Sequence, residues 1–291
     1  MSDKKNKNSK KKIWTILYIL LGIACLFCIA AMGIYIMAGR RQEEQTALEH
    51  ETLLELVAEA ETETNDLPET AETETVEKAD LPIDFEELQS INPEIYAWIR
   101  IPDTTVDYPV LQHDGEDQSY YLKHTIYGEV ETAASIYTEW YNSKDFTDPN
   151  TIIYGHNMKK GMFHDLRYFA EQEYFDAHED LYIYMPDKIL RYQIFTSYEY
   201  DDRHLLASFD FKDEEVYAEY LEEIMNPRSM YVMLREGVEL DTQDRIVTLS
   251  TCVANKPNNR RLVQAVLVEE LEAEYKGVDE VEHEGGTEDG E

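Results

Sequence analysis

A long apolar stretch near the start of the chain dominates its hydrophobic pattern. Residues 13–38 contain no charged side chain, and six lysines lie among the twelve residues before them. This stretch exceeds the roughly 20 residues that a helix needs to cross a bilayer core. A cleavable signal peptide is the alternative, but its apolar region is usually only about 7–15 residues long and ends at small residues. The pattern therefore favours an uncleaved transmembrane anchor.

The lysines also predict the orientation of this anchor. Cytoplasmic flanks carry an excess of Lys and Arg, so residues 1–12 are expected in the cytoplasm and the chain after residue 40 outside. This arrangement predicts a single-pass protein of the cell membrane. Cys25 and Cys28 fall inside the span, where we expect them to pack or face lipid rather than to bind a metal.

Acidic segments flank the remainder of the chain. Residues 39–81 are rich in Glu, Thr and Ala, and partial helical spacing of leucines predicts a helix over 43–61. Residues 62–78 have too few apolar side chains to form a core, so we expect disorder there. The interpretation is an acidic, partly disordered spacer at 39–81 and an acidic disordered tail at 273–291.

Residues 82–272 remain, and their length suits one domain with a sizeable core. Short segments rich in β-branched and aromatic residues, separated by turn signals, predict the strands of an all-β sandwich or barrel. These segments are 97–101, 105–111, 135–140, 151–154, 181–185, 190–198, 245–252 and 262–269.

Helices are predicted between these strands at 84–90, 163–169 and 213–225. The third is the clearest, because apolar residues recur on one face and Asn226-Pro227 stops it. We therefore expect a β-barrel decorated by helices.

Charge and motif content exclude several functions. The formal net charge of −35 at pH 7 argues against a nucleic-acid partner, because phosphates would be repelled. The histidines and cysteines show no zinc-ligand spacing, and neither a glycine-rich phosphate loop nor a G-x-S-x-G motif occurs. We expect no metal and no cofactor.

Cys252 is the only cysteine outside the apolar stretch, so it cannot form a disulfide within an extracellular domain. It is either a buried small hydrophobe or a nucleophile. On a strand, Ser250 and Cys252 share one face, and a loop rich in Asn follows. A position at the end of a strand favours the nucleophile, although an inert buried cysteine remains the alternative.

A thiol with a usual pKa of about 8.5 needs a basic or cationic partner. His156 follows the predicted strand 151–154 and, like Cys252, stands at a strand end. Eight residues separate Cys252 from Arg261, so an antiparallel hairpin would bring the two together. An arginine there can stabilise a developing oxyanion. Arg260 is interpreted as a surface residue of the loop.

Several separated motifs, in the same order along the chain, resemble those of class B sortases, the cell-wall cysteine transpeptidases of Gram-positive bacteria. The resemblance covers about residues 82–270. The motifs lie at residues 91–102, 106–110, 120–122, 134–137, 154–163 and 248–252.

The resemblance implies a closed eight-stranded barrel with one long helix between the sixth and seventh strands, where 213–225 lies. It implies catalytic roles for Cys252, His156 and Arg261. By the same carry-over, substrate-binding positions are Leu122, Ser250 and Thr251. Some class B sortases have an acidic residue soon after the cysteine, whereas this chain has Val253, Ala254 and Asn255 there.

The implied function is a membrane-anchored transpeptidase with an extracellular catalytic domain. It would cleave a C-terminal sorting signal of surface proteins through a thioacyl intermediate and join them to a peptidoglycan amine. Three alternatives remain open at this point: a pilin-polymerising sortase, a papain-like hydrolase, and a non-catalytic binding domain tethered to the membrane.

Overall fold

The computed structural model describes residues 25–38, 40–41, 44, 47–54, 78–159, 161–227 and 232–276. The chain divides into two compact units, Met1–Glu49 and His50–Glu291. Residues 25–38 of the first unit are helical. None of the described helices is both long and apolar enough to cross a membrane. Residues 13–24 of the predicted span, like most of the predicted spacer and tail, lie outside the described residues.

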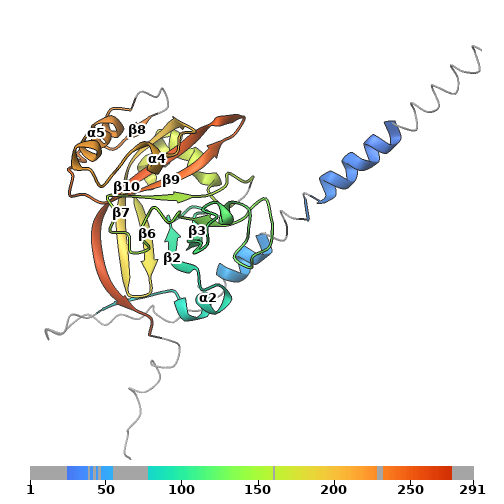
Figure 1. The fold of residues 1–291 in the computed structure, drawn as a ribbon, viewed down its shortest axis with the longest axis horizontal. Helices are drawn as coiled ribbons and strands as arrows, with labels where there is room; N and C mark the ends of the chain where they lie inside the picture. Colours follow the sequence, from blue (N-terminus) through green and yellow to red (C-terminus); the bar gives the residue numbers. More distant parts are fainter. Residues whose placement is uncertain are drawn as a thin grey trace, which may run out of the picture. The chain divides into compact units, whose positions relative to one another are not determined.

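A closed barrel of eight strands forms the body of the second unit (Figure 1). Its strands run in the order β10-β9-β5-β4-β3-β2-β6-β7, and pairing of β7 with β10 closes the ring. The β3–β4 and β5–β9 pairs are parallel, and the other pairs are antiparallel. The strands are β2 (Ile95–Arg100), β3 (Asp107–Leu111), β4 (Ile136–Tyr137), β5 (Asn150–Tyr154), β6 (Asp180–Met185), β7 (Lys188–Asp201), β9 (Ile246–Val253) and β10 (Lys256–Glu274).

All eight predicted strands are present, and the expected closed barrel is confirmed. The segment predicted at 135–140 forms a strand of just two residues, β4. Two short strands add to this sheet: β1 (Ala79–Asp80) pairs with the C-terminal end of β10, and β8 (Met233–Leu234) pairs with Thr196 and Ser197 of β7. Strand pairing thus extends beyond the predicted bounds of 82–272 at both ends.

Helical segments connect these strands. They are α2 (Phe85–Ile91), η1 (Tyr120–Leu122), η2 (His164–Ala170), α3 (Gln172–Ala177), α4 (Leu205–Ser208) and α5 (Glu214–Met225). The segment predicted at 163–169 is the 3-10 helix η2. Helix α5 lies between the sixth and seventh strands of the barrel, as the resemblance implies, and Asp213 caps it by accepting from two backbone N–H groups.

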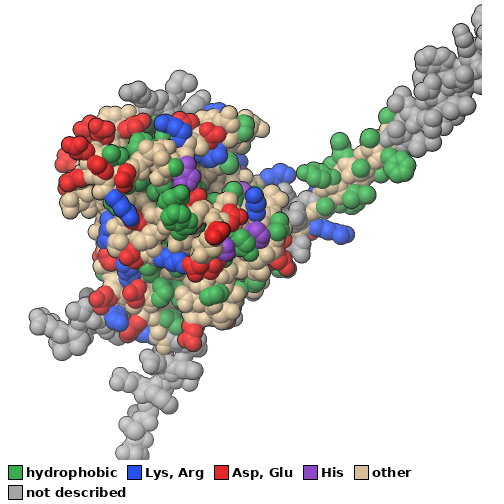
Figure 2. All heavy atoms as spheres, viewed as in Figure 1, with side chains coloured by type: hydrophobic (Ala, Val, Ile, Leu, Met, Phe, Trp, Pro, Cys, Tyr) green, Lys and Arg blue, Asp and Glu red, His purple; other side chains and the backbone are tan. Residues whose placement is uncertain are grey.

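Alternation of side chains along β9 and β10 contributes to two of the three apolar clusters among the described residues. Val247, Leu249 and Val263 belong to the barrel interior. Ile246 and Leu262, on the other face, pack with the buried side of α5. The solvent side of α5 carries exposed glutamates, and acidic side chains gather over this helix in Figure 2.

A buried polar network ties α5 to the sheet. The Tyr220 hydroxyl accepts from Gln264 Nε2 at 2.7 Å and from Asn150 Nδ2 at 3.4 Å. Gln264 Nε2 also donates to Thr248 Oγ1 at 2.8 Å, and Thr248 in turn donates to Asn150 Oδ1 at 2.9 Å. Because burial makes an unpaired polar group costly, these contacts fix the position of the helix over β5, β9 and β10.

Candidate active site

Cys252 lies at the C-terminal end of β9, and its side chain is exposed. The six residues of β9 that precede it are all buried. The strand therefore carries the thiol out of the core and to the rim of the barrel. This exposure contradicts the alternative in which Cys252 is a buried core residue.

His156 lies beside the same rim because β5 and β9 run parallel. Their register pairs Tyr154 with Ser250, and the N–H of Gly155 donates to the carbonyl of Ser250 at 3.1 Å. Two residues further along each segment come His156 and Cys252. The two segments therefore end side by side, with His156 and Cys252 at the same edge of the sheet.

The ring of His156 is held by a backbone carbonyl. Its Nε2 atom lies 2.8 Å from the carbonyl oxygen of Leu122, at the end of η1. A carbonyl oxygen accepts hydrogen bonds and cannot donate, so Nε2 carries the hydrogen. In the neutral ring, Nδ1 is therefore the basic nitrogen. Leu122 itself is half-buried. It is a predicted substrate position, and its backbone carbonyl also contacts His156.

Gly155 permits the close packing from which His156 emerges. A Cβ atom on Gly155 would lie 2.6 Å from the Phe163 ring and closer still to Ile136. Phe163 donates its N–H to the carbonyl of His156 at 3.0 Å, which closes the loop that follows the histidine. A larger residue than glycine at this position would clash with the side chains of Ile136 and Phe163.

Asn157 joins the histidine loop to the cysteine strand. Its Nδ2 donates to the backbone carbonyl of Cys252 at 2.8 Å, and its Oδ1 lies 3.2 Å from Nδ1 of His164. Asn157 had no predicted role in the site. Its position next to His156 was the available signal, but the partner is 95 residues away in the chain.

The hairpin between β9 and β10 brings two arginines to this corner. Arg260 pairs with Cys252 across the ladder, and Arg261 pairs with Thr251. Directly opposite residues share a face of the sheet, so the register places Arg260 on the face of Cys252 and Arg261 on the alternate face. Both arginines lie within β10, so the interpretation of Arg260 as a loop residue is wrong.

Arg261 is a buried cation with a carboxylate partner. It is 5% exposed, and its Nη2 lies 3.3 Å from Oε1 of Glu199 on β7. Burial lowers the pKa of the Arg261 guanidinium, and the charge of Glu199 opposes that shift. The guanidinium keeps its charge at neutral pH because an arginine pKa starts above 12.

The predicted substrate positions on β9 differ in their surroundings. Ser250 lies on the face of Cys252 and is 7% exposed. Thr251 is 2% exposed and donates its hydroxyl to the carbonyl of Gly155 at 2.7 Å. The Thr251 hydroxyl therefore links β9 to β5 within the protein.

Two tyrosines that were not predicted as site residues, Tyr137 and Tyr154, lie on the neighbouring strands β4 and β5. Burial raises the pKa of Tyr137, and the charges of Glu139, Asp117 and Cys252 add to the shift. This places Tyr137 within electrostatic range of the thiol. Its ring stacks on that of Tyr154, with centroids 5.4 Å apart.

A histidine–carboxylate pair connects α4 to the segment after β4. His204 Nε2 lies 2.6 Å from Oε2 of Glu139, whose side chain is 9% exposed. The hydrogen bond that His204 donates to Glu139 raises the pKa of His204, while burial opposes the rise. The His204 ring also lies 6.2 Å from that of Tyr154, so this pair borders the tyrosines near the thiol.

Comparison with known proteins identifies the family. A family model described as the Sortase domain matches residues 99–268, more than half of the chain. The chain belongs to the sortase family. Sortase B of Listeria monocytogenes is 35% identical over 188 residues, which cover 64% of this chain and 74% of the relative.

Solved structures of sortase B give the same result for the fold. The structure from Clostridium perfringens is 31% identical, with a TM-score of 0.58, and the match covers 64% of this chain and 100% of that one. A substrate complex of Staphylococcus aureus sortase B is 28% identical, with a TM-score of 0.56, over 64% of this chain and 84% of that one. This sortase therefore has the cysteine transpeptidase fold of its class B relatives.

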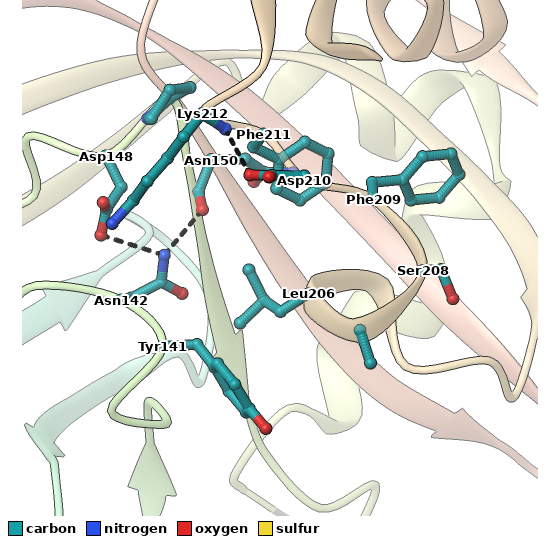
Figure 3. Close-up of a pocket in the computed structure, with 12 residues that line it drawn as sticks. Tyr141, Asn142, Asp148, Asn150, Leu206, Ser208, Phe209, Asp210, Phe211 and Lys212 are labelled. Carbon is teal, nitrogen blue, oxygen red and sulfur yellow. Dashed lines mark hydrogen bonds between the residues drawn. The ribbon is translucent and has the colours of Figure 1, made fainter.

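A separate cavity of about 300 Å³ lies away from the thiol of this sortase. It opens between the segment that leads into β5 and the segment around α4 (Figure 3). Asn142 supports one wall by donating to Asp148 and to the carbonyl of Asn150. Neither Cys252 nor His156 lines this cavity.

Proposed function

We propose that this protein is a membrane-anchored class B transpeptidase. In this proposal it cleaves a C-terminal sorting signal of surface proteins and transfers them to a peptidoglycan amine. The observation that carries the proposal is the exposed thiol of Cys252 at the end of β9, tied to the loop of His156 by the side chain of Asn157. Nucleophile and proton carrier are thereby joined at one rim.

The first half-reaction acylates Cys252. Its thiolate attacks the peptide carbonyl and forms a C–S bond. We assign stabilisation of the tetrahedral oxyanion to Arg261, whose side chain must reach it around the strand end because it starts on the face of the sheet opposite Cys252. Arg260, on the face of Cys252, is the alternative, and a loss of activity in Arg260→Ala but not in Arg261→Ala would select it. The C–N bond then breaks, and the imidazolium of His156 gives a proton to the leaving amine. The products are a thioester on Cys252 and the released C-terminal peptide.

The second half-reaction reverses these roles. An acceptor amine attacks the thioester, His156 accepts a proton from it, and the C–S bond breaks to return the thiolate. The Leu122 carbonyl holds Nε2 in both halves, so we assign the proton transfers to Nδ1. Ser250 and Leu122 line the substrate path in this proposal. Thr251 supports it indirectly, through its bond to Gly155.

The anchor is part of the same proposal. The described helix over 25–38 exposes large apolar side chains such as Phe27, Met32 and Tyr35, which supports a lipid environment. With residues 1–12 in the cytoplasm, the catalytic unit lies outside the cell and meets membrane-bound precursors.

A peptide-cleavage assay on the full chain tests the reaction. A sorting-signal peptide library and a diaminopimelate-type or glycyl amine are supplied, and the thioacyl adduct is sought by mass spectrometry. Wild type should cleave a library member and carry the adduct on the peptide that contains Cys252, and Cys252→Ala should do neither. The matched control replaces Cys25 and Cys28 together by Ala and should retain activity, because neither lies in the second unit.

Two results would overturn the proposal. Cleavage of the peptide by Cys252→Ala would contradict the assignment of Cys252 as the nucleophile. Absence of cleavage by wild type, with Cys252 unmodified by a thiol reagent, would favour a binding domain. Preference for a protein lysine over the cell-wall amine would instead identify a pilin-polymerising enzyme.

A further inference from the structure

Glu199 occupies the point where β7, β10 and the segment after Cys252 meet. It pairs directly with Arg261 across the β7–β10 ladder, with Oε1 3.3 Å from Nη2. Its other oxygen, Oε2, lies 2.6 Å from Nζ of Lys256, the first residue of β10. One carboxylate thus contacts two cations of β10, both of which follow the turn after Cys252.

We propose that Glu199 is a positioning residue that fixes the Arg261 guanidinium and the β9–β10 turn relative to Cys252. The inference rests on the proposed function, because it assigns Glu199 a role in that reaction. Glu199 contacts the arginine and the lysine rather than substrate, so it acts through them.

Burial makes a counter-charge important for Arg261. The side chains of Arg261 and Glu199 are 7% and 14% exposed, so water screens their charges weakly. A buried guanidinium without a counter-charge is strongly unfavourable, and a paired one has a restricted orientation. The oxyanion stabilisation proposed for Arg261 depends on that orientation, because preorganised charge needs no rearrangement during the reaction.

The position of Glu199 also bears on a departure in the sequence. Val253, Ala254 and Asn255 follow the cysteine, where some class B sortases have an acidic residue. In this chain the carboxylate that contacts Arg261 comes from the neighbouring strand β7.

The first test compares two glutamate substitutions in the full chain. Glu199→Gln should lower kcat for peptide cleavage about tenfold with little change in KM, because misplacement of a catalytic group costs up to about 100-fold. The matched control is Glu269→Gln, which removes the ion pair of Glu269 with Arg191 across the same two strands. That control should keep the wild-type kcat. Glu199→Asp should recover part of the loss.

A double-mutant cycle separates positioning from general stability. In an Arg261→Ala background, Glu199→Gln should lower kcat less than twofold further if it acts through the arginine. An equal fall in both backgrounds would overturn the inference.

If Glu199→Gln does not fold, Lys256→Gln takes its place, and we expect a two- to threefold fall in kcat. An unchanged kcat in the variant that is measured would overturn the inference while leaving the proposed function intact. If wild type neither cleaves the peptide nor forms a thioester on Cys252, both fail together.

Discussion

The side chain of Asn157 donates a hydrogen bond of 2.8 Å to the backbone carbonyl of Cys252. This bond joins the loop after β5 to the end of β9 at the point where the proposed nucleophile and proton carrier must meet. Hydrogen bonding to the main chain makes the link independent of the thiol's own chemistry. It therefore offers a way to disturb the geometry of the site without removing a reacting group.

Replacing Asn157 by Ala should lower kcat/KM for peptide cleavage roughly 2- to 10-fold. The estimate follows from the net value of one hydrogen bond, about 0.5–1.5 kcal/mol, expressed as a rate factor. The control is Asn226→Ala, which removes an exposed asparagine side-chain bond at the end of α5. Equal loss of activity in both variants would argue against a specific link at Cys252.

Gly155→Ala should damage both stability and activity. The added Cβ meets Phe163 and Ile136, and overpacking of this kind costs about 1–3 kcal/mol of unfolding free energy. Because His156 is the next residue, kcat should fall further than the fraction of folded protein explains. Denaturant unfolding and cleavage rates check the two effects. Gly33→Ala is the control, since its added Cβ meets no atom within 4 Å.

The pair of Glu139 and His204 predicts a pH-dependent contribution to stability. Glu139 raises the pKa of His204 above the value of about 6.5 expected in the unfolded chain. The contribution is therefore fully present below that unfolded value and is lost as pH rises through the higher folded-state pKa. The difference in Tm between wild type and His204→Gln should be larger at pH 6 than at pH 9. A difference that grows with pH would contradict the assignment.

Tyr220→Phe tests the buried network beneath α5. The substitution removes the oxygen to which Gln264 and Asn150 donate, and an unsatisfied buried donor costs about 1–3 kcal/mol. The midpoint of urea unfolding should fall accordingly. Tyr182→Phe removes a hydroxyl from a half-buried tyrosine of β6 and should change the midpoint less. An unchanged midpoint for Tyr220→Phe would show that the network contributes little.

The strand ends that carry the site could be predicted because turn signals follow them closely. Predicted segments 151–154 and 245–252 match β5 and β9 within about a residue at each end. Gly155 and the turn at Asn255 mark where the strands stop, whereas Asn258 and Asn259, predicted as loop, belong to β10. Alternation then correctly placed Ser250 on the face of Cys252.

The pairing of residues far apart in the chain could not be predicted from the sequence. Glu199 meets Arg261 through the β7–β10 register, and a shift of one residue would turn either side chain to the other face. Residues 273 and 274, at the acidic end of β10, were similarly predicted to belong to the disordered tail. In the structure, Glu269 and Glu270 face cations of β7, Arg191 and Lys188, which offset their repulsion on an exposed strand.

Strand β10 is the final strand of the barrel in chain order, yet it pairs with both β7 and β9. During synthesis, the sheet formed by residues 95–253 therefore has an open edge until residues up to about 272 have left the ribosome. Such non-local closure carries a loop-entropy cost and slows folding. A chain cut short before β10 would contain both Cys252 and His156 and still lack the closed rim. Catalytic turnover therefore requires that the whole domain has been synthesised and folded.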